Sequence, residues 1–314
     1  MPLMIFTPFA LELIFNAVVF EKCYSPRHSV KCLLMGVLLI FSSSLWAEKV
    51  AIVVQKAIPA VNILAQRVAE KTDFTVTVIL AEQFKKSLYD CVVLVGDRPL
   101  ETWDVDIDIP VISILSSRAA VENASFLSSA IYVEPPLGRQ VALVRLILSD
   151  AENLGVLVLN DDFNRLSQEI SQLPKSSKIR LYNIDKYDSF NRALIDLLSD
   201  NRVLIGQYDS DIYSANNIEN ILITAYRHNV PLVGPSHAYI NAGALASIYS
   251  DLTDVAQRLS EILLGGVDRN NWAQPDYNSY FSVSYNHQVA RSLNLNLPDA
   301  TAVAAKIKQA EQQK

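Results

Sequence analysis

The sequence predicts an α/β protein built from two doubly wound parallel-sheet lobes. Short β-branched and apolar runs alternate with longer amphipathic stretches along most of the chain, and this strand–helix alternation is typical of parallel sheets with helices on both faces. The alternation is interrupted at Pro135-Pro136 and then begins again. A chain of 314 residues is long enough to hold two such halves.

The first half contains four expected strands, at residues 50–54, 74–80, 91–95 and 110–115. The first strand is a continuous apolar run, as expected for a strand that is buried on both faces. Between the first two strands, residues 59–71 carry apolar side chains at helical spacing. A short extended segment follows at 131–137, and its prolines Pro135 and Pro136 prevent further pairing and indicate a crossover between lobes.

After a helix expected at 138–148, the second half repeats the same order. The expected strands are 154–159, 179–185, 203–208 and 230–234, and the helices between them are 163–173, 189–199 and 214–228. Residues 238–249 are small and apolar, and 252–264 form an amphipathic helix that ends at Gly265-Gly266. A polar loop at 270–278, a strand at 280–285 and helices at 288–293 and 300–311 complete the chain.

A secretory leader is expected at residues 1–47. Lys31 supplies a positive charge, residues 32–41 an apolar segment too short to span a bilayer, and Ala47 a small residue at the expected cleavage point. Residues 2–20 are also apolar, although Pro8 and Glu12 interrupt them. Two interpretations stay open: a membrane anchor, or a start assigned too far upstream, with initiation near residue 30. We expect a periplasmic location for the mature chain.

Charge and cysteine content exclude several classes of protein. The net charge is −6 and no block of basic residues occurs, so nucleic acid is not an expected partner. Two of the three cysteines, Cys23 and Cys32, lie in the leader. The remaining Cys91 lies in an apolar run and is expected to be a buried small hydrophobe, so no disulfide framework is predicted.

Catalysis is not expected, and neither a cofactor nor a metal is predicted. His228, His237 and His287 are far apart and lack the carboxylates or cysteines of a metal site. No nucleophile elbow, P-loop or dinucleotide-binding fingerprint occurs in the chain.

Candidate ligand-binding residues follow from the rule that ligands bind beyond the carboxyl ends of the strands in open α/β sheets. In the first lobe the rule selects Gln55, Lys56, Asp97, Arg98, Ser116 and Ser117, and in the second Asp161, Asp162, Phe163, Tyr208, Asp209, Ser236 and Tyr239. These side chains suit a polar ligand, with Arg98 available for an anionic group and an aromatic ring available for stacking.

Most of these candidates also have a purely structural interpretation. Asp97, the three serines and the aspartates at 161 and 162 could cap helices, Arg98 could pair with Glu101, and the two tyrosines could pack in the core.

Three segments of the chain, taken together, resemble segments of a known family. They are Ile221-Leu222-Ile223-Thr224-Ala225-Tyr226-Arg227-His228-Asn229-Val230-Pro231-Leu232-Val233-Gly234-Pro235-Ser236 continuing through 238–246, then Pro135-Pro136-Leu137-Gly138-Arg139-Gln140, and finally 281–293. Together they resemble the periplasmic substrate-binding components of ABC transporters, in the branch of uncharacterised ABC-type transport systems related to the tryptophan-binding type. The resemblance covers most of residues 90–298.

This resemblance implies a fold like that of type I periplasmic binding proteins, in which two lobes joined by a hinge close on a small molecule. It implies crossings near 133–137, 234–238 and 265–280. The expected lobes are 48–134 plus about 238–268, and 135–237 plus about 278–314. A monomer that delivers its ligand to an ABC permease is the implied function.

One segment departs from the family. Members that bind aromatic amino acids carry a Ser/Gly/Asn-rich loop after the fourth strand, whereas this chain has Ser116-Ser117-Arg118-Ala119-Ala120-Val121. This departure weakens the implication that the ligand is an amino acid. The competing hypothesis is a sensing or assembly subunit that presents the same fold to a membrane sensor or an outer-membrane receptor.

Overall fold

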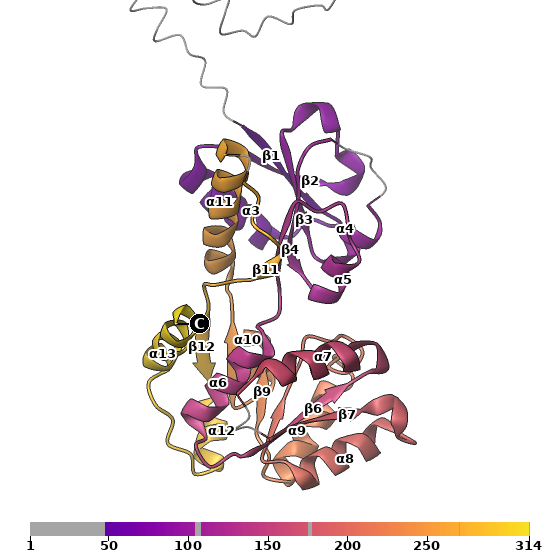
Figure 1. Ribbon diagram of the computed structural model, residues 1–314, viewed down its shortest axis with the longest axis vertical. Coiled ribbons are helices and arrows are strands. Elements are labelled where there is room, and N and C mark those ends of the chain that lie inside the picture. Colours follow the sequence, from indigo (N-terminus) through magenta and orange to yellow (C-terminus); the bar gives the residue numbers. More distant parts are fainter. Residues whose placement is uncertain (1–47, 104–107, 175–177, 270, 314) are drawn as a thin grey trace, which may run out of the picture. The chain divides into compact units, whose positions relative to one another are not determined.

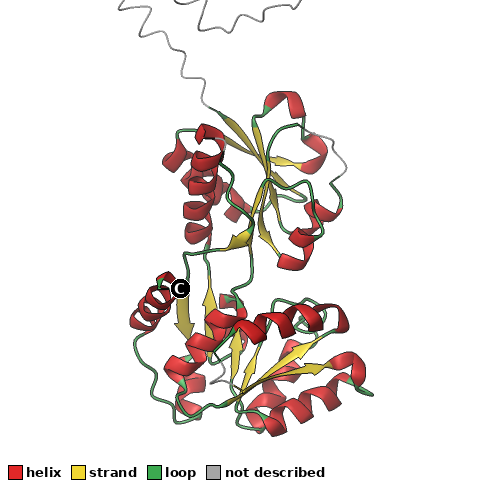
Figure 2. Ribbon diagram, viewed as in Figure 1, coloured by secondary structure: helices red, strands yellow, loops and turns green. Residues whose placement is uncertain are grey.

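The computed structural model describes residues 48–103, 108–174, 178–269 and 271–313. The expected leader, residues 1–47, lies outside these described residues. The remainder, Glu48–Lys314, forms a compact unit that contains two six-stranded sheets (Figures 1 and 2). None of the helices in the described ranges is long and apolar enough to cross a membrane.

The first sheet has the strand order β11-β5-β4-β3-β1-β2, and all of its pairs are parallel. Its strands are β1 Lys49–Val54, β2 Thr75–Leu80, β3 Cys91–Val95, β4 Val111–Ser116, β5 Ser129–Tyr132 and β11 Asp276–Tyr277. The chain order reverses between β1 and β3, because β2 lies on one side of β1 and the later strands lie on the other. Such a reversal is where ligands bind in doubly wound folds.

Alternate residues of β1 face two separate cores, as the two-residue period of a strand requires. Val50, Ile52 and Val54 pack toward α3 (Pro59–Thr72) and α11 (Leu252–Arg269), which lie side by side in Figure 1. Ala51 and Val53 face the other core, beneath the short helices α4 (Asp97–Glu101) and α5 (Arg118–Glu122). Burial on both faces explains the uninterrupted apolar run.

The second sheet repeats this topology, with the order β12-β10-β9-β8-β6-β7. Its strands are β6 Asn153–Val158, β7 Lys178–Asn183, β8 Val203–Ile205, β9 Leu232–Gly234, β10 Ala246–Tyr249 and β12 Ser282–Tyr285. The reversal of chain order here lies between β6 and β8. The pair β10–β12 is antiparallel, so the sheet is parallel in its body and mixed at one edge, which corrects the expectation of purely parallel sheets.

Helices cover both faces of this sheet. One core forms with α6 (Leu137–Ile147), α7 (Asn160–Gln172), α12 (His287–Ser292) and α13 (Ala300–Gln312). The other forms with α8 (Phe190–Asp200), α9 (Ile218–Arg227) and α10 (His237–Ala242). Short 3-10 turns occur at Ala81–Gln83, Lys86–Leu88 and Ile184–Lys186.

The chain passes between the two sheets three times. The first passage follows β5 at Pro135-Pro136, as expected, and the third lies between β11 and β12. The second follows β10, because β10 pairs with β9 and β12. Residues 238–249, expected in the first lobe, therefore belong with the second sheet, to which they contribute β10 and part of α10. A short, unalternating apolar run carries no local signal of which sheet it joins.

Gly155 in β6 permits the close approach of α8. A Cβ atom at this position would lie 2.5 Å from Cγ of the fully buried Leu197. We expect Gly155→Ala to lower the free energy of unfolding by about 1–3 kcal/mol, because overpacking displaces neighbouring groups. Urea denaturation would measure this change. The double variant Gly155→Ala/Leu197→Ala should lose less than the sum of its single changes, and strict additivity would contradict the proposed clash.

Candidate functional site

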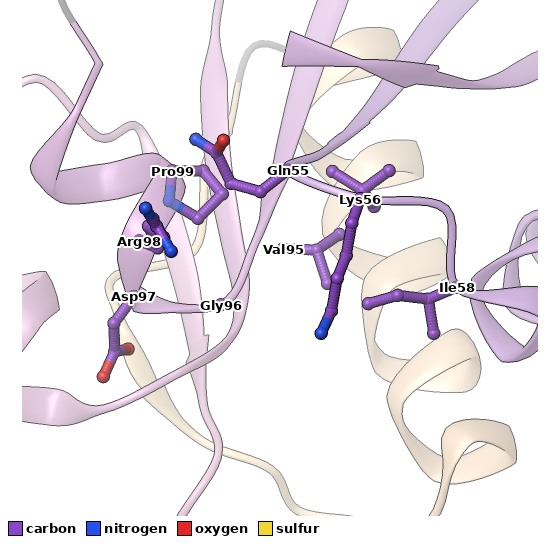
Figure 3. Close-up of a pocket in the computed structure, with 9 residues that line it drawn as sticks. Gln55, Lys56, Ile58, Val95, Gly96, Asp97, Arg98 and Pro99 are labelled. Carbon is purple, nitrogen blue, oxygen red and sulfur yellow. The ribbon is translucent and has the colours of Figure 1, made fainter.

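A pocket of about 460 Å³ lies at the carboxyl ends of β1 and β3, at the chain reversal of the first sheet. Gln55 and Lys56 follow β1 on one side of the pocket, and Asp97 and Arg98 follow β3 on the other (Figure 3). The strand-end rule thus predicts residues that line one pocket. Gln55 donates from its Nε2 to Thr102 Oγ1 at 3.0 Å, which holds the loop after β1 against α4.

Asp97 does not cap the helix that it begins. Gly96, with φ of +84°, occupies the N-cap position of α4, a conformation that glycine adopts without strain. Oδ1 of Asp97 instead accepts a hydrogen bond from the backbone N–H of Ser117 at 2.6 Å. This contact joins the loops after β3 and β4.

Arg98 is exposed at the rim of the pocket. Among the described residues it forms no ion pair with Glu101, so the expected pairing is not found in the structure. The guanidinium is thus placed where it could contact an anionic group of a ligand.

The two serines after β4 have structural roles. Ser116 is 0 % exposed, and its hydroxyl accepts a hydrogen bond from Ser113 Oγ at 2.7 Å. Its expected ligand contact is therefore corrected: Leu115 adopts φ of +55° and the register with β5 shifts between Ile114 and Ser116, which keeps the Ser116 side chain inside. Ser117 caps α5 and accepts from Ala120 N–H at 3.2 Å, as its alternative interpretation predicts.

Glu134, which the strand-end rule did not select, is not among the residues that line the pocket, but it is bound by the same loop as the pocket residue Asp97. It follows β5, and its Oε1 accepts a hydrogen bond from the backbone N–H of Arg118 at 2.9 Å. Burial raises the pKa of this carboxyl to about 7, although the backbone N–H groups of Arg118 and of Glu134 itself and the charge of Arg165 lower it. Two consecutive backbone amides, of Ser117 and Arg118, thus bind the carboxylates of Asp97 and Glu134. Only its place just beyond a strand could have indicated Glu134.

In the second sheet the chain order reverses between β6 and β8. The loops that follow these two strands carry the candidate residues of the second lobe. Asp161 is exposed in the first turn of α7, while Asp162 pairs with Arg165 at 2.7 Å. Neither side chain is the N-cap, because Leu159 holds that position. Phe163 packs against the core of the lobe and lies beneath Lys186 Nζ, which is 5.0 Å from the ring centroid.

Tyr208 and Asp209 lie beyond β8, which is shorter than expected. The ring of Tyr208 is 45 % exposed, which leaves it free to stack on a ligand. Asp209 accepts hydrogen bonds from the N–H groups of Asp211 and Ile212, each at 2.8 Å, so its carboxylate organises the loop that carries Tyr208. Partial burial raises the pKa of both side chains.

A glutamine pair supports the same loop and is also missed by the sequence analysis. Gln140 is buried in α6, and its Nε2 donates to the carbonyl oxygen of Gly206 at 2.8 Å. Its Oε1 accepts from Gln207 Nε2 at 2.9 Å. These bonds fix the backbone that leads to Tyr208.

Ser236 and Tyr239 follow β9 at the start of α10. Ser236 occupies the N-cap position but makes no side-chain capping bond. Tyr239 packs against the backbone of Gly234, where a Cβ would lie 2.5 Å from Tyr239 Cβ, and its ring lies 6.0 Å from that of Tyr213. Burial raises the pKa of Tyr239 to about 12. Most of the Tyr239 side chain thus packs in the core, as its structural interpretation predicts.

A metal site and a reactive thiol each place requirements on the described histidines, cysteine and carboxylates. No group of three or more His, Cys, Asp or Glu side chains within the described ranges could hold a metal ion. Burial raises the pKa of the Cys91 thiol to about 12, and a thiol that stays protonated is unreactive.

Comparison with protein-family models finds no match, and neither does comparison with curated protein sequences. Solved structures do match. One is the ligand-free, open structure of a substrate-binding protein with adhesive properties from Clostridium difficile, with a TM-score of 0.63, 13% identity, and coverage of 81% of this chain and 97% of that chain. The described residues therefore have the same fold as the Clostridium difficile protein. The expected fold, with two α/β lobes, is thereby confirmed.

Two further structures have TM-scores of 0.55. An ABC domain from Streptococcus pneumonia in complex with L-Trp is 13% identical, with coverage of 82% of this chain and 97% of that chain. A conserved domain protein from Vibrio cholerae is 16% identical, with coverage of 82% and 98%. Each match covers almost the whole length of the solved chain, so the similarity includes both lobes.

Proposed function

We propose that this protein is a periplasmic solute-binding protein that captures a small polar molecule and delivers it to an ABC permease. The observation that carries the proposal is that each of the two sheets has a reversal of chain order. Polar side chains lie just beyond the carboxyl ends of the strands at each reversal. Three passages of the chain between the sheets suit a hinge. The solved structures with the same fold, one bound to L-Trp and one described as a substrate-binding protein, support this function.

Native mass spectrometry of the chain, purified from a periplasmic extract without refolding, tests the proposal. We expect an excess mass that is lost on denaturation. A protein without bound mass, with no thermal shift across amino acids, amines, sugars, peptides and anions, would overturn the binding function. It would favour a subunit that presents the fold to a membrane sensor or receptor.

Tyr208 is expected to contribute a stacking surface to the ligand. Replacing it by alanine should weaken binding roughly tenfold, since aromatic contacts contribute about 0.5–1.5 kcal/mol beyond their buried area. Isothermal titration with the captured molecule would measure the loss. The matched control is Tyr226→Ala, which removes a 60 % exposed tyrosine from α9, away from the reversal. Equal losses in both variants, or none in either, would exclude a role for Tyr208.

A further inference from the structure

Glu134 has a carboxylate oxygen that the protein leaves without a partner. Its Oε1 accepts from Arg118 N–H at 2.9 Å, but its Oε2 is buried and makes no hydrogen bond. Among the described residues it is the only carboxylate oxygen in that condition. A buried oxygen of this kind is costly unless a donor reaches it, so its position beyond β5 calls for an explanation.

The positive groups around Glu134 are engaged with other side chains. Arg118 directs Nε to Glu122 at 2.6 Å and Nη1 to the hydroxyl of Tyr277 at 3.2 Å. Arg165 donates from both Nε and Nη2 to Asp162. Within the described ranges Glu134 therefore accepts from backbone N–H groups but forms no ion pair, and a second carboxylate, that of Asp97, lies close enough to raise its pKa.

The two carboxylates belong to adjacent loops at the carboxyl edge of the first sheet. The N–H groups of Ser117 and Arg118 bind one oxygen of each, Asp97 Oδ1 and Glu134 Oε1. Asp97 also lines the pocket at the chain reversal. These amides reach one oxygen of each carboxylate, and a ligand group that supplies donors and positive charge would satisfy the unpartnered Glu134 Oε2.

We propose that Glu134 binds an ammonium group of the ligand through Oε2, so that the captured molecule is an organic amine. This inference rests on the solute-binding function proposed above and names its substrate class. An ammonium supplies up to three N–H donors and a positive charge, whereas a neutral hydroxyl supplies one donor and no charge.

The proposal implies a pH dependence of binding. With a pKa of about 7, the Glu134 carboxylate should rise from about a tenth ionised at pH 6 to about nine tenths at pH 8. The other titratable and charged groups that face it are Arg118 on α5, Asp97 on α4, Arg165 on α7 and the phenols of Tyr132, Tyr208 and Tyr277. Ordinary amines stay protonated across this range, so their affinity should rise about tenfold from pH 6 to pH 8.

Matched probes test this inference. The full chain and its Glu134→Gln variant would be titrated with putrescine against 1,4-butanediol and with tyramine against 4-ethylphenol, alongside the molecule found by native mass spectrometry. We expect an amine to bind more tightly than its amine-free counterpart. Glu134→Gln should weaken amine binding at least tenfold and abolish its pH dependence. Glu101→Gln, which changes an exposed carboxylate on α4, should change neither.

The outcomes separate the two proposals. A captured molecule that lacks a protonatable nitrogen and binds equally well to the wild type and Glu134→Gln overturns the amine inference and leaves the solute-binding function standing. Failure of every molecule to bind overturns both. Thermal unfolding of Glu134→Gln checks the fold, and Glu134→Asp, which keeps the charge, should retain part of the affinity if the carboxylate itself binds the amine.

Discussion

Replacing Arg139 by alanine should lower the free energy of unfolding by about 2–4 kcal/mol. The guanidinium is 6 % exposed and binds Glu311 of α13 through Nε and Nη2, at 2.8 and 3.0 Å. Its Nη1 donates to the carbonyl oxygen of Asn278 at 2.9 Å. Breaking a buried, hydrogen-bonded pair by removing one partner costs about 3–5 kcal/mol. We expect less because the Glu311 side chain is 35 % exposed, so solvent can partly replace its partner.

Packing adds to this effect. The Arg139 guanidinium lies 4.1 Å from the ring centroid of the fully buried Phe281, in the segment that leads from the third passage into β12. Arg139 thus connects α6 with α13 and with the segment before β12. Because cation–π stacking and the two-pronged ion pair both need the planar guanidinium, Arg139→Lys should recover little of the loss.

Chemical denaturation of Arg139→Ala, Arg139→Lys and Glu311→Gln would test this prediction. The matched control is Arg192→Ala, which breaks an ion pair with Asp196 whose arginine is 66 % exposed; it should change stability by less than about 0.5 kcal/mol. A similarly small change for Arg139→Ala would show that the contact does not hold the C-terminal helix in place.

Glu134 should make the protein less stable as the pH rises from about 4.5 to about 7. Its carboxyl has a pKa of about 7 in the folded chain, against an ordinary value of 4.5. In this window the folded state holds a proton that the unfolded state has lost, so the unfolded state binds fewer protons and the free energy of unfolding falls with pH. This stabilising contribution is fully present at a pH below the unfolded-state pKa of 4.5, and it is lost as the pH rises through the folded-state pKa of about 7.

The size of this effect follows from the shift. One unit of pKa corresponds to 1.36 kcal/mol, so the shift corresponds to roughly 3 kcal/mol between pH 4 and pH 8. Glu134→Gln cannot titrate, and its stability relative to the wild type should therefore improve as the pH rises. Urea denaturation at several pH values would measure the difference, with Glu101→Gln as a control. Parallel profiles for the wild type and Glu134→Gln would contradict the raised pKa.

Much of the fold could be predicted from local patterns. The apolar run Val50–Val54 reads as a strand buried on both faces because its alternate residues meet two different cores. The restart of the strand–helix alternation after Pro135-Pro136 indicates a second lobe. The strand-end rule selects Gln55, Asp97 and Arg98, which line one pocket, because it depends only on the order of the strands.

The side-chain roles at the site could not be predicted in the same way. Ser116 follows a strand as Asp97 does, yet a positive φ at Leu115 keeps its hydroxyl buried against Ser113. Tyr239 packs against the backbone of Gly234 from the helix that follows β9. Both outcomes depend on how closely neighbouring backbone segments approach, which a single sequence does not express.

By itself, the sequence determined the two-lobed α/β architecture, the parallel strands in the body of each sheet and most of the loops that carry polar side chains, because apolar periodicity and proline positions act over a few residues. Only the tertiary structure decided that β10 joins the second sheet, that Gln140 supports the loop before Tyr208 and that Glu134 retains an unpartnered oxygen. These features depend on residues far apart in the chain, and burial and hydrogen-bond satisfaction exist only once those residues have packed together.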